Sequence, residues 1–462
     1  MSVVGAIMVP HPPILLPEVG RGEEKKIAAT AAAYERAAAF AAELKPDTIV
    51  LASPHTVMYS DYFHISPGKS AKGDMGQFRA PQLRFRVNYD TEFVKELAAL
   101  CEREGFSAGT LGERKAELDH GTMIPLYYVN HYWQDYQLVR IGLSGLPLAE
   151  HYRLGQMIRQ TADKLDRRVL FIGSGDLSHK LRDDGPYGFV KEGPDYDERI
   201  MDVMGRAAFD ELLDFDESFC EKAAECGHRS FCILAGALDG KSLATEHLSH
   251  EGTFGVGYSV CTYRVLGDDP DRRLLENWEE RQRAILMEKR EKEDAYVRLA
   301  RAVIDAWILK RKRVTPPDDL PPEMKARRAG VFVSLHKDGR LRGCIGTIQP
   351  VRICVAEEII DNAISASTRD PRFSPVRAEE LSSLEISVDV LSEPEEIASR
   401  DELDVKRYGV IVSKGSRRGL LLPNLDGVDT VDEQISIALR KAGISEREKG
   451  ITLERFEVVR HV

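Results

Sequence analysis

Three short apolar runs in the N-terminal part of the sequence each lead into a histidine. The runs and their histidines are 3–9 with His11, 49–52 with His55, and 169–173 with His179. Apolar, β-branched runs of this length, bounded by Pro or Gly, predict strands buried on both faces. Because open α/β sheets bind ligands beyond the carboxyl ends of their strands, we expect the imidazoles at one edge of a sheet. Such a cluster indicates a metal or catalytic site.

An Fe(II) site of the common non-haem type needs a carboxylate beside two neutral imidazoles, and it leaves coordination positions open for substrate and O₂. His11 and His55 would supply the nitrogens. Glu225 is the candidate carboxylate, because it ends a predicted helix beside Gly227, the expected residue after the helix C-cap, where a side chain can leave the helix. A further imidazole, His120, stands next to Asp119, which is a ready orienting group.

The bulk properties indicate a soluble protein of more than one domain. A chain of 462 residues exceeds one ordinary hydrophobic core, so two or three domains are expected. The formal net charge of −11 argues against a dedicated nucleic-acid binder. No apolar run reaches the length of a membrane span and no signal-like leader precedes the first strand, so we expect a cytoplasmic location without membrane contact.

Cysteine usage excludes several kinds of site. The seven cysteines are scattered without CxxC spacing, so the sequence contains no disulfide framework and no zinc-finger or iron–sulfur signature. We expect reduced thiols.

Strands and helices alternate through residues 1–268, which are expected to form an α/β domain. The Ala-rich stretch 23–44 predicts a helix between the first two strands, and this β–α–β opening implies parallel strands. Residues 68–76 are expected to be loop, 83–87 an edge strand and 253–266 a closing hairpin strand. The fold class predicted for this part is a three-layer α/β/α domain with a mostly parallel sheet.

The composition changes near residue 269. Residues 269–292 are rich in Lys and Glu and predict a solvated helical linker. Residues 293–462 contain two hairpin patterns, 331–346 and 410–423, an alternating strand at 384–391, and helices at 355–366 and 430–442. This second domain is expected to be α+β with mostly antiparallel strands.

The first domain resembles the class III extradiol ring-cleavage dioxygenases. The resemblance lies in Val9-Pro-His-Pro-Pro, Ser53-Pro-His, Asp119-His-Gly and Gly173-Ser-Gly-Asp-Leu-Ser-His. It implies that Fe(II) is bound by His11, His55 and Glu225, and that His120 and His179 act as acid and base on a phenolic substrate. Asp119 and Asp176 would then be second-layer groups that fix imidazole tautomers.

The same architecture also resembles the Memo-like proteins, in which a cysteine matches Cys226. That resemblance makes Cys226 an alternative metal ligand and leaves Zn or another divalent metal open beside Fe(II). A thiol hydrolase that uses Cys226 with His179 is a further, less favoured interpretation.

The second domain resembles the AMMECR1 family. The resemblance rests on Leu341-Arg-Gly-Cys-Ile-Gly-Thr and Asp370-Pro-Arg-Phe. Its candidate functional residues are Arg342, Gly343, Cys344, Gly346, Asp370 and Arg372. Arg342 is expected beside the Cys344 thiol, where it would lower the pKa of that thiol. A buried cysteine among structural glycines is an equally open interpretation.

Two functions follow from these observations. The first is an Fe(II)-dependent oxidoreductase of the extradiol dioxygenase type, acting on a phenolic or other metal-chelating small molecule. The second is a metal-binding accessory protein without dioxygenase turnover. The fusion resembles proteins encoded beside a Memo-like protein and a radical SAM enzyme, which implies such partners in a modification pathway. A homodimer through either domain is also open.

Overall fold

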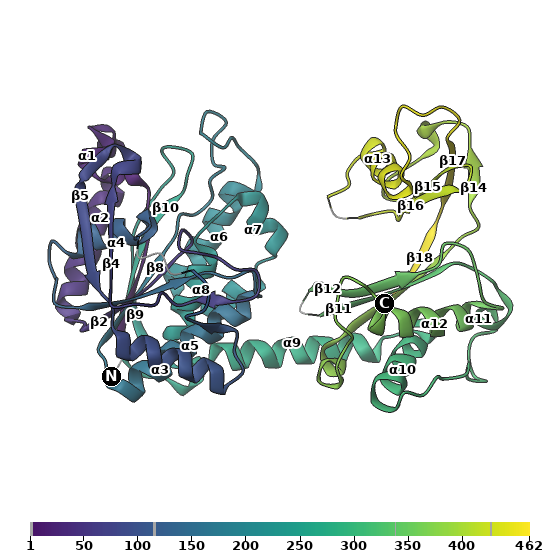
Figure 1. The fold of residues 1–462 in the computed structure, drawn as a ribbon, viewed down its shortest axis with the longest axis horizontal. Coiled ribbons are helices and arrows are strands. Elements are labelled where there is room, and N and C mark those ends of the chain that lie inside the picture. Colours follow the sequence, from purple (N-terminus) through teal and green to yellow (C-terminus); the bar gives the residue numbers. More distant parts are fainter. Residues whose placement is uncertain (1–2, 114–116, 338, 426) are drawn as a thin grey trace. The chain divides into compact units, whose positions relative to one another are not determined.

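A computed structural model describes residues 3–113, 117–337, 339–425 and 427–462 (Figure 1). It divides the chain into two compact units, Met1–Glu280 and Arg281–Val462, and each is described by itself. None of the helices in the described residues has the length and apolarity needed to cross a membrane. The predicted domain limits, 1–268 and 293–462, stay a prediction.

The N-terminal unit is built on a six-stranded sheet with the order β7-β2-β8-β1-β10-β9. The first four of these strands are mutually parallel, while β10 and β9 continue the sheet in antiparallel pairing. Their bounds are β1 Val3–Val9, β2 Thr48–Ser53, β7 Gln137–Gly142, β8 Val169–Ser174, β9 Lys241–Glu251 and β10 Tyr258–Asp268. The predicted α/β class with a mostly parallel sheet is confirmed.

Helices cover both faces of this sheet (Figure 1). In β2, Ile49 and Leu51 pack toward α2 and α4, whereas Val50 and Ala52 pack toward α3, α5 and α8. This alternation explains why the strand is apolar throughout. The helices are α1 Pro17–Gly20, α2 Ala28–Leu44, α3 Thr91–Arg103, α4 His120–Val129, α5 Leu148–Leu165, α6 Glu192–Arg206, α7 Glu217–Ala223 and α8 His228–Ala237.

The expected loop at 68–76 was wrong, because most of it forms strand β4, Ser70–Met75. This strand pairs in antiparallel fashion with β5, Ala80–Asn88. Only Ala71 and Met75 of β4 are buried, so the sequence shows too little alternation to predict a strand. A second small pairing joins β3, Phe63–His64, to β6, Ala108–Gly109.

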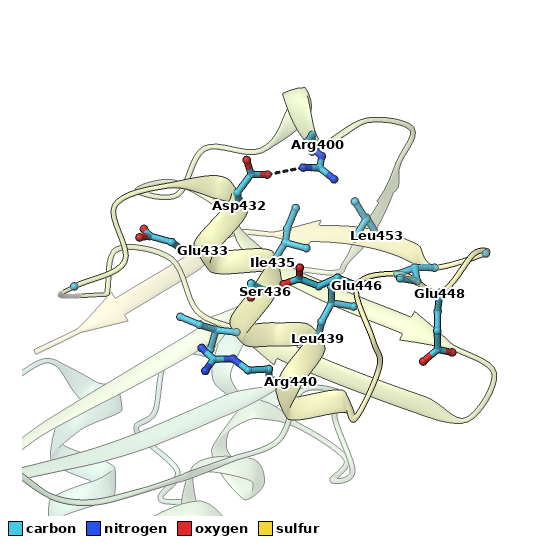
Figure 2. Close-up of a pocket in the computed structure, with 14 residues that line it drawn as sticks. Arg400, Asp432, Glu433, Ile435, Ser436, Leu439, Arg440, Glu446, Glu448 and Leu453 are labelled. Carbon is cyan, nitrogen blue, oxygen red and sulfur yellow. Dashed lines mark hydrogen bonds and ion pairs between the residues drawn. The ribbon is translucent and has the colours of Figure 1, made fainter.

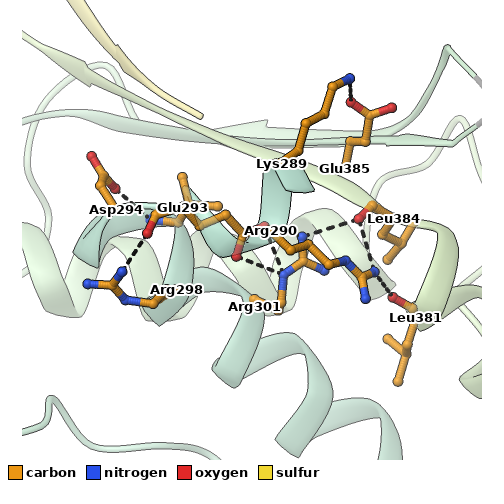
Figure 3. Close-up of polar contacts among 10 residues, drawn as sticks. Lys289, Arg290, Glu293, Asp294, Arg298, Arg301, Leu381, Leu384 and Glu385 are labelled. Atoms are coloured by element: carbon orange, nitrogen blue, oxygen red, sulfur yellow. Dashed lines mark hydrogen bonds and ion pairs between the residues drawn. The ribbon is translucent and has the colours of Figure 1, made fainter. Parts of the chain in front are cut away.

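The predicted charged linker coincides largely with helix α9, Leu274–Glu291, of which Leu275 is the buried residue. Three residues separate α9 from α10, Ala295–Lys310, and the last of them, Asp294, is the N-cap of α10. Polar contacts fix this junction, because Glu293 forms an ion pair with Arg301 while Arg290 donates to the carbonyl of Leu381 (Figure 3).

The C-terminal unit contains two antiparallel sheets, with the orders β12-β11-β13-β18 and β14-β17-β15-β16. Helices α10 and α12 pack on the first sheet and α13 packs on the second. The bounds are α11 Pro322–Ala326, β11 Val331–Lys337, β12 Arg340–Gly346, α12 Val355–Thr368, β13 Glu385–Leu391, β14 Glu395–Ile397, β15 Gly409–Lys414, β16 Arg417–Leu421, α13 Val431–Ala442, β17 Thr452–Phe456 and β18 Val458–His461. A separate β-rich second domain is confirmed.

The crossing of α5 and α8 provides a test of the N-terminal core. A Cβ at Gly236 would lie 1.8 Å from the carbonyl oxygen of Tyr152, so the backbones are too close for any side chain. We expect Gly236→Ala to lower the free energy of unfolding by about 3 kcal/mol, measured by urea denaturation. Gly205→Ala in α6 is the matched control, because no atom lies near its Cβ position, and we expect a gain of up to about 1 kcal/mol. Equal effects would contradict this account of the helix crossing.

Candidate metal centre

The two imidazoles His11 and His55 meet beyond the carboxyl ends of neighbouring strands. Strand β8 lies between β1 and β2 and is parallel to both, so all three strands end at the same edge of the sheet. Each histidine follows its strand by two residues. Their Nε2 atoms are 2.9 Å apart. His11 is buried and His55 is exposed, so one side of the pair faces solvent.

Ser174, at the end of β8, determines which nitrogen of His11 carries the proton. The Ser174 hydroxyl donates its single hydrogen to the carbonyl of Gly121 at 2.6 Å, so its oxygen must accept from Nδ1 of His11 at 3.0 Å. In a neutral ring, Nε2 then has the free lone pair. That lone pair points toward His55, as a metal ligand requires.

Cys226 completes a group of three possible ligands. Its Sγ lies 3.6 Å from Nε2 of His11, and the three ligand atoms of His11, His55 and Cys226 all lie within 4.8 Å of one another. Metal–nitrogen bonds of about 2.0 Å and metal–sulfur bonds of about 2.3 Å place two nitrogens of a tetrahedral ion roughly 3.3 Å apart, and a nitrogen and a sulfur roughly 3.5 Å apart. The observed spacings are close to these values, so the side chains fit a divalent metal ion.

The turn between α7 and α8 explains why Cys226, and not Glu225, joins this group. Helix α7 ends at Ala223, and Ala224 takes the left-handed conformation with φ of 54°. The expected role of Gly227 was wrong, because Gly227 is the N-cap of α8. The Glu225 carboxylate accepts from the backbone N–H of His228 at 2.6 Å and so caps α8. That Glu225 binds a metal stays a prediction, and its carboxylate is engaged in the hydrogen bond to His228.

Burial sets the charge of these groups. It lowers the pKa of His11 to about 3, helped by the neighbouring His55, so His11 is neutral near pH 7. The protein around the ring of His55 removes part of its water contact and so lowers its pKa as well, although the residue is exposed and Asp119 opposes the shift. The pKa of the Cys226 thiol is raised well above its ordinary value by burial and by the charges of Asp176 and Glu225. A bound cation would reverse that preference and favour the thiolate.

The two predicted second-layer carboxylates bind groups other than the imidazole rings. Asp119 accepts from the hydroxyls of Ser53 at 2.6 Å and Thr56 at 2.8 Å, and it forms an ion pair with Arg140 at 3.7 Å. Burial raises its pKa, but these contacts outweigh burial and hold the pKa below its ordinary value. Asp176 accepts from the backbone N–H of His11 at 2.8 Å. Asp119 therefore supplies negative charge and Asp176 fixes the backbone of His11, while Ser174 fixes the tautomer.

The two predicted acid–base histidines lie beside the group. The ring of His120 is 3.9 Å from that of His55 and 5.4 Å from that of His11, measured between centroids. Burial lowers the pKa of His120 to about 4. The charge of His179 acts on His11, and Nδ1 of His179 is buried without a hydrogen-bond partner in the described part of the chain. The ring of His120 thus lies in contact with the imidazole pair, and His179 lies within electrostatic reach of His11.

The comparison with protein families agrees with this geometry. The family described as "Catalytic LigB subunit of aromatic ring-opening dioxygenase" matches residues 5–261, which is more than half of the chain. The chain belongs to this family. Residues 297–461 match the AMMECR1 family, so a LigB domain is followed by an AMMECR1 domain and both predicted resemblances are confirmed.

Relatives match the whole chain or about a third of it. A protein of Clostridium acetobutylicum is 41% identical over 469 residues, which span 100% of this chain and 99% of that protein. A protein of Thermotoga maritima is 52% identical over 170 residues, covering 37% of this chain and 98% of that protein. A solved structure of an uncharacterized protein from Pyrococcus horikoshii is 34% identical, covers 37% of this chain and 90% of that chain, and has a TM-score of 0.35.

The predicted AMMECR1 residues are only partly arranged as expected. Arg342 is the extra residue of a β-bulge in β12, since Leu335 pairs with Gly343 and His336 with Leu341. The Arg342 guanidinium forms hydrogen bonds with Glu380 at 2.8 and 3.0 Å instead of lying beside the thiol. The other five lie on β12 and in the loop after α12: Gly343 approaches the backbone of α12, Gly346 packs on Phe332, and the Asp370 carboxylate joins the Cys344 N–H to Arg372.

A hollow of the AMMECR1 domain lies along α13 (Figure 2). Its volume is about 930 Å³, and its wall combines apolar side chains such as Leu439 and Leu453 with the ion pair of Arg400 and Asp432. Neither histidine nor cysteine is among its described lining residues. The hollow therefore lacks the metal-binding and nucleophilic groups that the LigB domain brings together.

Ser174 is the functional residue that sequence reasoning missed, although a lone serine closing an apolar strand beside the predicted site was a usable signal. We expect Ser174→Ala to weaken metal binding roughly 10–100-fold, because Nδ1 of His11 loses its acceptor. The measurement is a competition titration with a chromogenic chelator.

Ser259→Ala is the matched control for that variant. Ser259 is also buried and also donates one hydrogen bond to a backbone carbonyl, that of Ser249 at 2.8 Å, but it lies on β10. Its metal affinity should equal that of the wild type. If both variants bound the metal like the wild type, Ser174 would not set the tautomer of His11.

Proposed function

We propose that the LigB domain is a metal-dependent oxidoreductase of the extradiol dioxygenase type, acting on a phenolic or other metal-chelating small molecule. The observation that carries the proposal is the convergence of Nε2 of His11, Nε2 of His55 and Sγ of Cys226 at the end of the parallel strands. Fe(II) is the proposed metal, because two imidazoles and one anionic ligand leave positions for substrate and O₂. When bound, Fe(II) would supply the site where substrate and O₂ meet.

The chain itself supplies proton transfer beside that site. His120 is neutral at physiological pH, and its ring lies against that of His55. Its free nitrogen is suited to accept a proton from a phenolic hydroxyl group. The unpartnered Nδ1 of His179 is a second nitrogen that is suited to hold or return a proton.

A hollow next to His11 supports a ring-bearing substrate. It has a volume of about 490 Å³ and is lined by Pro12 and Pro13, which directly follow His11, together with the aromatic rings of Phe254 and Tyr258. Arg182 lies at the same hollow and pairs with Asp184 at 2.8 Å. The wall is thus largely apolar with one guanidinium group, as expected for a small aromatic molecule with a polar substituent.

A second candidate is a metal-binding accessory protein that works with Memo-like and radical SAM partners. The presence of Cys226, rather than a carboxylate, beside the imidazoles favours this candidate. A thiol hydrolase is not proposed, because burial keeps the pKa of the Cys226 thiol high, which is the opposite of what a nucleophilic thiol needs.

Metal content of anaerobically purified protein tests the ligand set. We expect near-stoichiometric iron in the wild type, and loss of iron in His55→Ala and in Cys226→Ser. Glu225→Gln, at the neighbouring position, is the control. It should keep its iron, because the Glu225 carboxylate of the wild type caps α8. Iron lost in Glu225→Gln but kept in Cys226→Ser would contradict the thiolate ligand and restore the carboxylate.

Oxygen uptake with a panel of catechols tests the reaction. We expect uptake by the iron-loaded wild type, and a rate roughly 10²–10⁴-fold lower in His120→Gln, since a proton-transfer group is removed while the ligands remain. Iron content should be unchanged in that variant. Stoichiometric iron without uptake of any substrate in the panel would overturn the dioxygenase proposal and support the accessory role.

A further inference from the structure

Strand β5 pairs with β4 on one side, and its other side is an open edge over most of its length within the described residues. Hydrogen-bonded and non-hydrogen-bonded pairs alternate along an antiparallel ladder. The N–H of Tyr89 donates to the carbonyl of Lys69 at 3.0 Å, so the hydrogen-bonded pairs of β5 fall at odd residue numbers. The backbone N–H and C=O groups of Arg84, Arg86 and Asn88 therefore point away from β4.

Hydrogen bonds at the flanks of the hairpin agree with this assignment. On the far side of β4, the carbonyl of Lys72 accepts from the N–H of Leu118 at 2.9 Å, as expected if the pair of Lys72 and Arg86 directs its backbone groups outward. Beyond the end of β5, the N–H of Asp90 donates to the carbonyl of Leu138 on β7 at 3.0 Å. The three outward-pointing residues before it have no backbone partner in the part of the chain that the structure describes.

A hollow of about 420 Å³ lies along this open edge. All residues from Leu83 to Asn88 line it, so the hollow is bordered by the backbone edge of the strand and not only by one of its faces. Tyr127 and Tyr136 also line it, and they pack against the same core as Leu83 and Phe85. Open backbone donors and acceptors thus lie beside aromatic rings.

The hairpin of β4 and β5 is basic, although the whole chain has a formal charge of −11. Residues 70–88 contain one carboxylate, that of Asp74, and four cations, which are Lys72, Arg79, Arg84 and Arg86. The carboxylate of Asp74 accepts from the backbone N–H two residues later. All four cations are exposed, and none of them forms an ion pair with another described residue. The charge of this surface therefore favours an anionic ligand.

We propose that the open edge of β5 binds an extended acidic segment of a partner protein, which adds a strand to the β4–β5 sheet. The backbone of the segment pairs with the open N–H and C=O groups of β5. Its acidic side chains lie beside Arg84 and Arg86 on the exposed face, and the side chains between them point toward Tyr127 and Tyr136. The surface therefore recognises alternating acidic and apolar residues.

A second copy of this chain is a poorer occupant of the same edge. Two β5 strands that pair in antiparallel fashion around Phe85 place Arg84 of each copy opposite Arg86 of the other. Like charges directly opposite one another destabilise a sheet, and charged residues on an edge strand commonly prevent such self-pairing. An acidic strand meets the same two arginines with the opposite charge.

Peptide binding to the full-length protein tests this surface. The probe is the fluorescein-labelled peptide Glu-Val-Glu-Phe-Glu-Val-Glu, titrated by fluorescence anisotropy. We expect saturable binding that weakens as salt is added, because exposed charges are screened. The same peptide methylated on every backbone nitrogen keeps its charges but cannot donate to a strand edge. We expect this methylated peptide to bind at least about tenfold more weakly.

Arg86→Gln tests the role of charge, and Arg79→Gln is the matched control. Both arginines are exposed and belong to the same hairpin, but Arg79 lies at its turn and not on the open edge. We expect Arg86→Gln to weaken binding of the probe about tenfold, through loss of one charge-assisted contact, and Arg79→Gln to bind like the wild type.

Arg86→Pro tests the role of the backbone. It removes the same charge as Arg86→Gln and also the N–H that points away from β4, so it should bind the probe more weakly than Arg86→Gln. Because that N–H has no partner on β4, the melting temperature should stay close to that of Arg86→Gln.

Four results would overturn the proposal. Equal binding of the methylated peptide would show that charge alone attracts the probe, as it would any anionic polymer. Equal weakening in Arg86→Gln and Arg79→Gln would indicate only the general charge of the hairpin. Dimerisation of the protein that Arg86→Pro abolishes, measured by analytical ultracentrifugation, would make a second copy the occupant. Absence of saturable binding would exclude the acidic segment as the ligand.

Discussion

The parallel pairing of β1 and β2 on the two sides of β8 is the constraint on which the metal centre depends. Parallel strands place their carboxyl ends at one edge, so residues 9, 53 and 174 end their strands together although they are far apart in the sequence. The residues just beyond then face one another without any long loop. Ser174 in the middle strand accepts from the ring of His11, and this contact turns a pair of nearby imidazoles into a pair with one defined lone pair.

The position of Cys226 beside the imidazoles depends on a close approach of two backbones. A Cβ at Gly175 would lie 2.1 Å from the Cα of Gly227, so only glycine at this point allows the start of α8 to reach the end of β8. The carbonyl of Asp176 accepts from the N–H groups of both Cys226 and Gly227 and holds the turn in place. These contacts fix the direction of Cys226 toward His11 and leave Glu225 to cap α8. The choice between the two neighbours is therefore made by backbone hydrogen bonds.

These backbone contacts explain why the sequence predicted the two imidazoles of the centre but did not decide between Glu225 and Cys226. Apolar runs ending on His11 and His55 follow from strand periodicity, and the parallel arrangement follows from the alternation of strands and helices. The position of Cys226 depends on where α7 ends. That end is marked by Ala224, whose left-handed conformation is not expected from the backbone preferences of alanine. In the same way, the bulge that turns Arg342 toward Glu380 has no marker in the sequence. The sequence therefore predicted Arg342 as the cation beside Cys344, whereas Arg372 is the one that donates to the Cys344 carbonyl. Regular elements were predictable, whereas single-residue irregularities decided the side-chain partners.

The two partly exposed thiols show how surroundings assign chemistry to the same side chain. Cys226 lies near the carboxylates of Asp176 and Glu225, which together with burial oppose a negative charge on its sulfur. Such a thiol becomes anionic when a metal cation supplies the missing positive charge, and this links its charge to metal binding. Cys344 has different surroundings: the Ser334 hydroxyl donates to its sulfur at 3.2 Å, and Arg372 donates to its backbone carbonyl. The groups around each sulfur, and not the side chain itself, therefore decide that Cys226 is the candidate metal ligand.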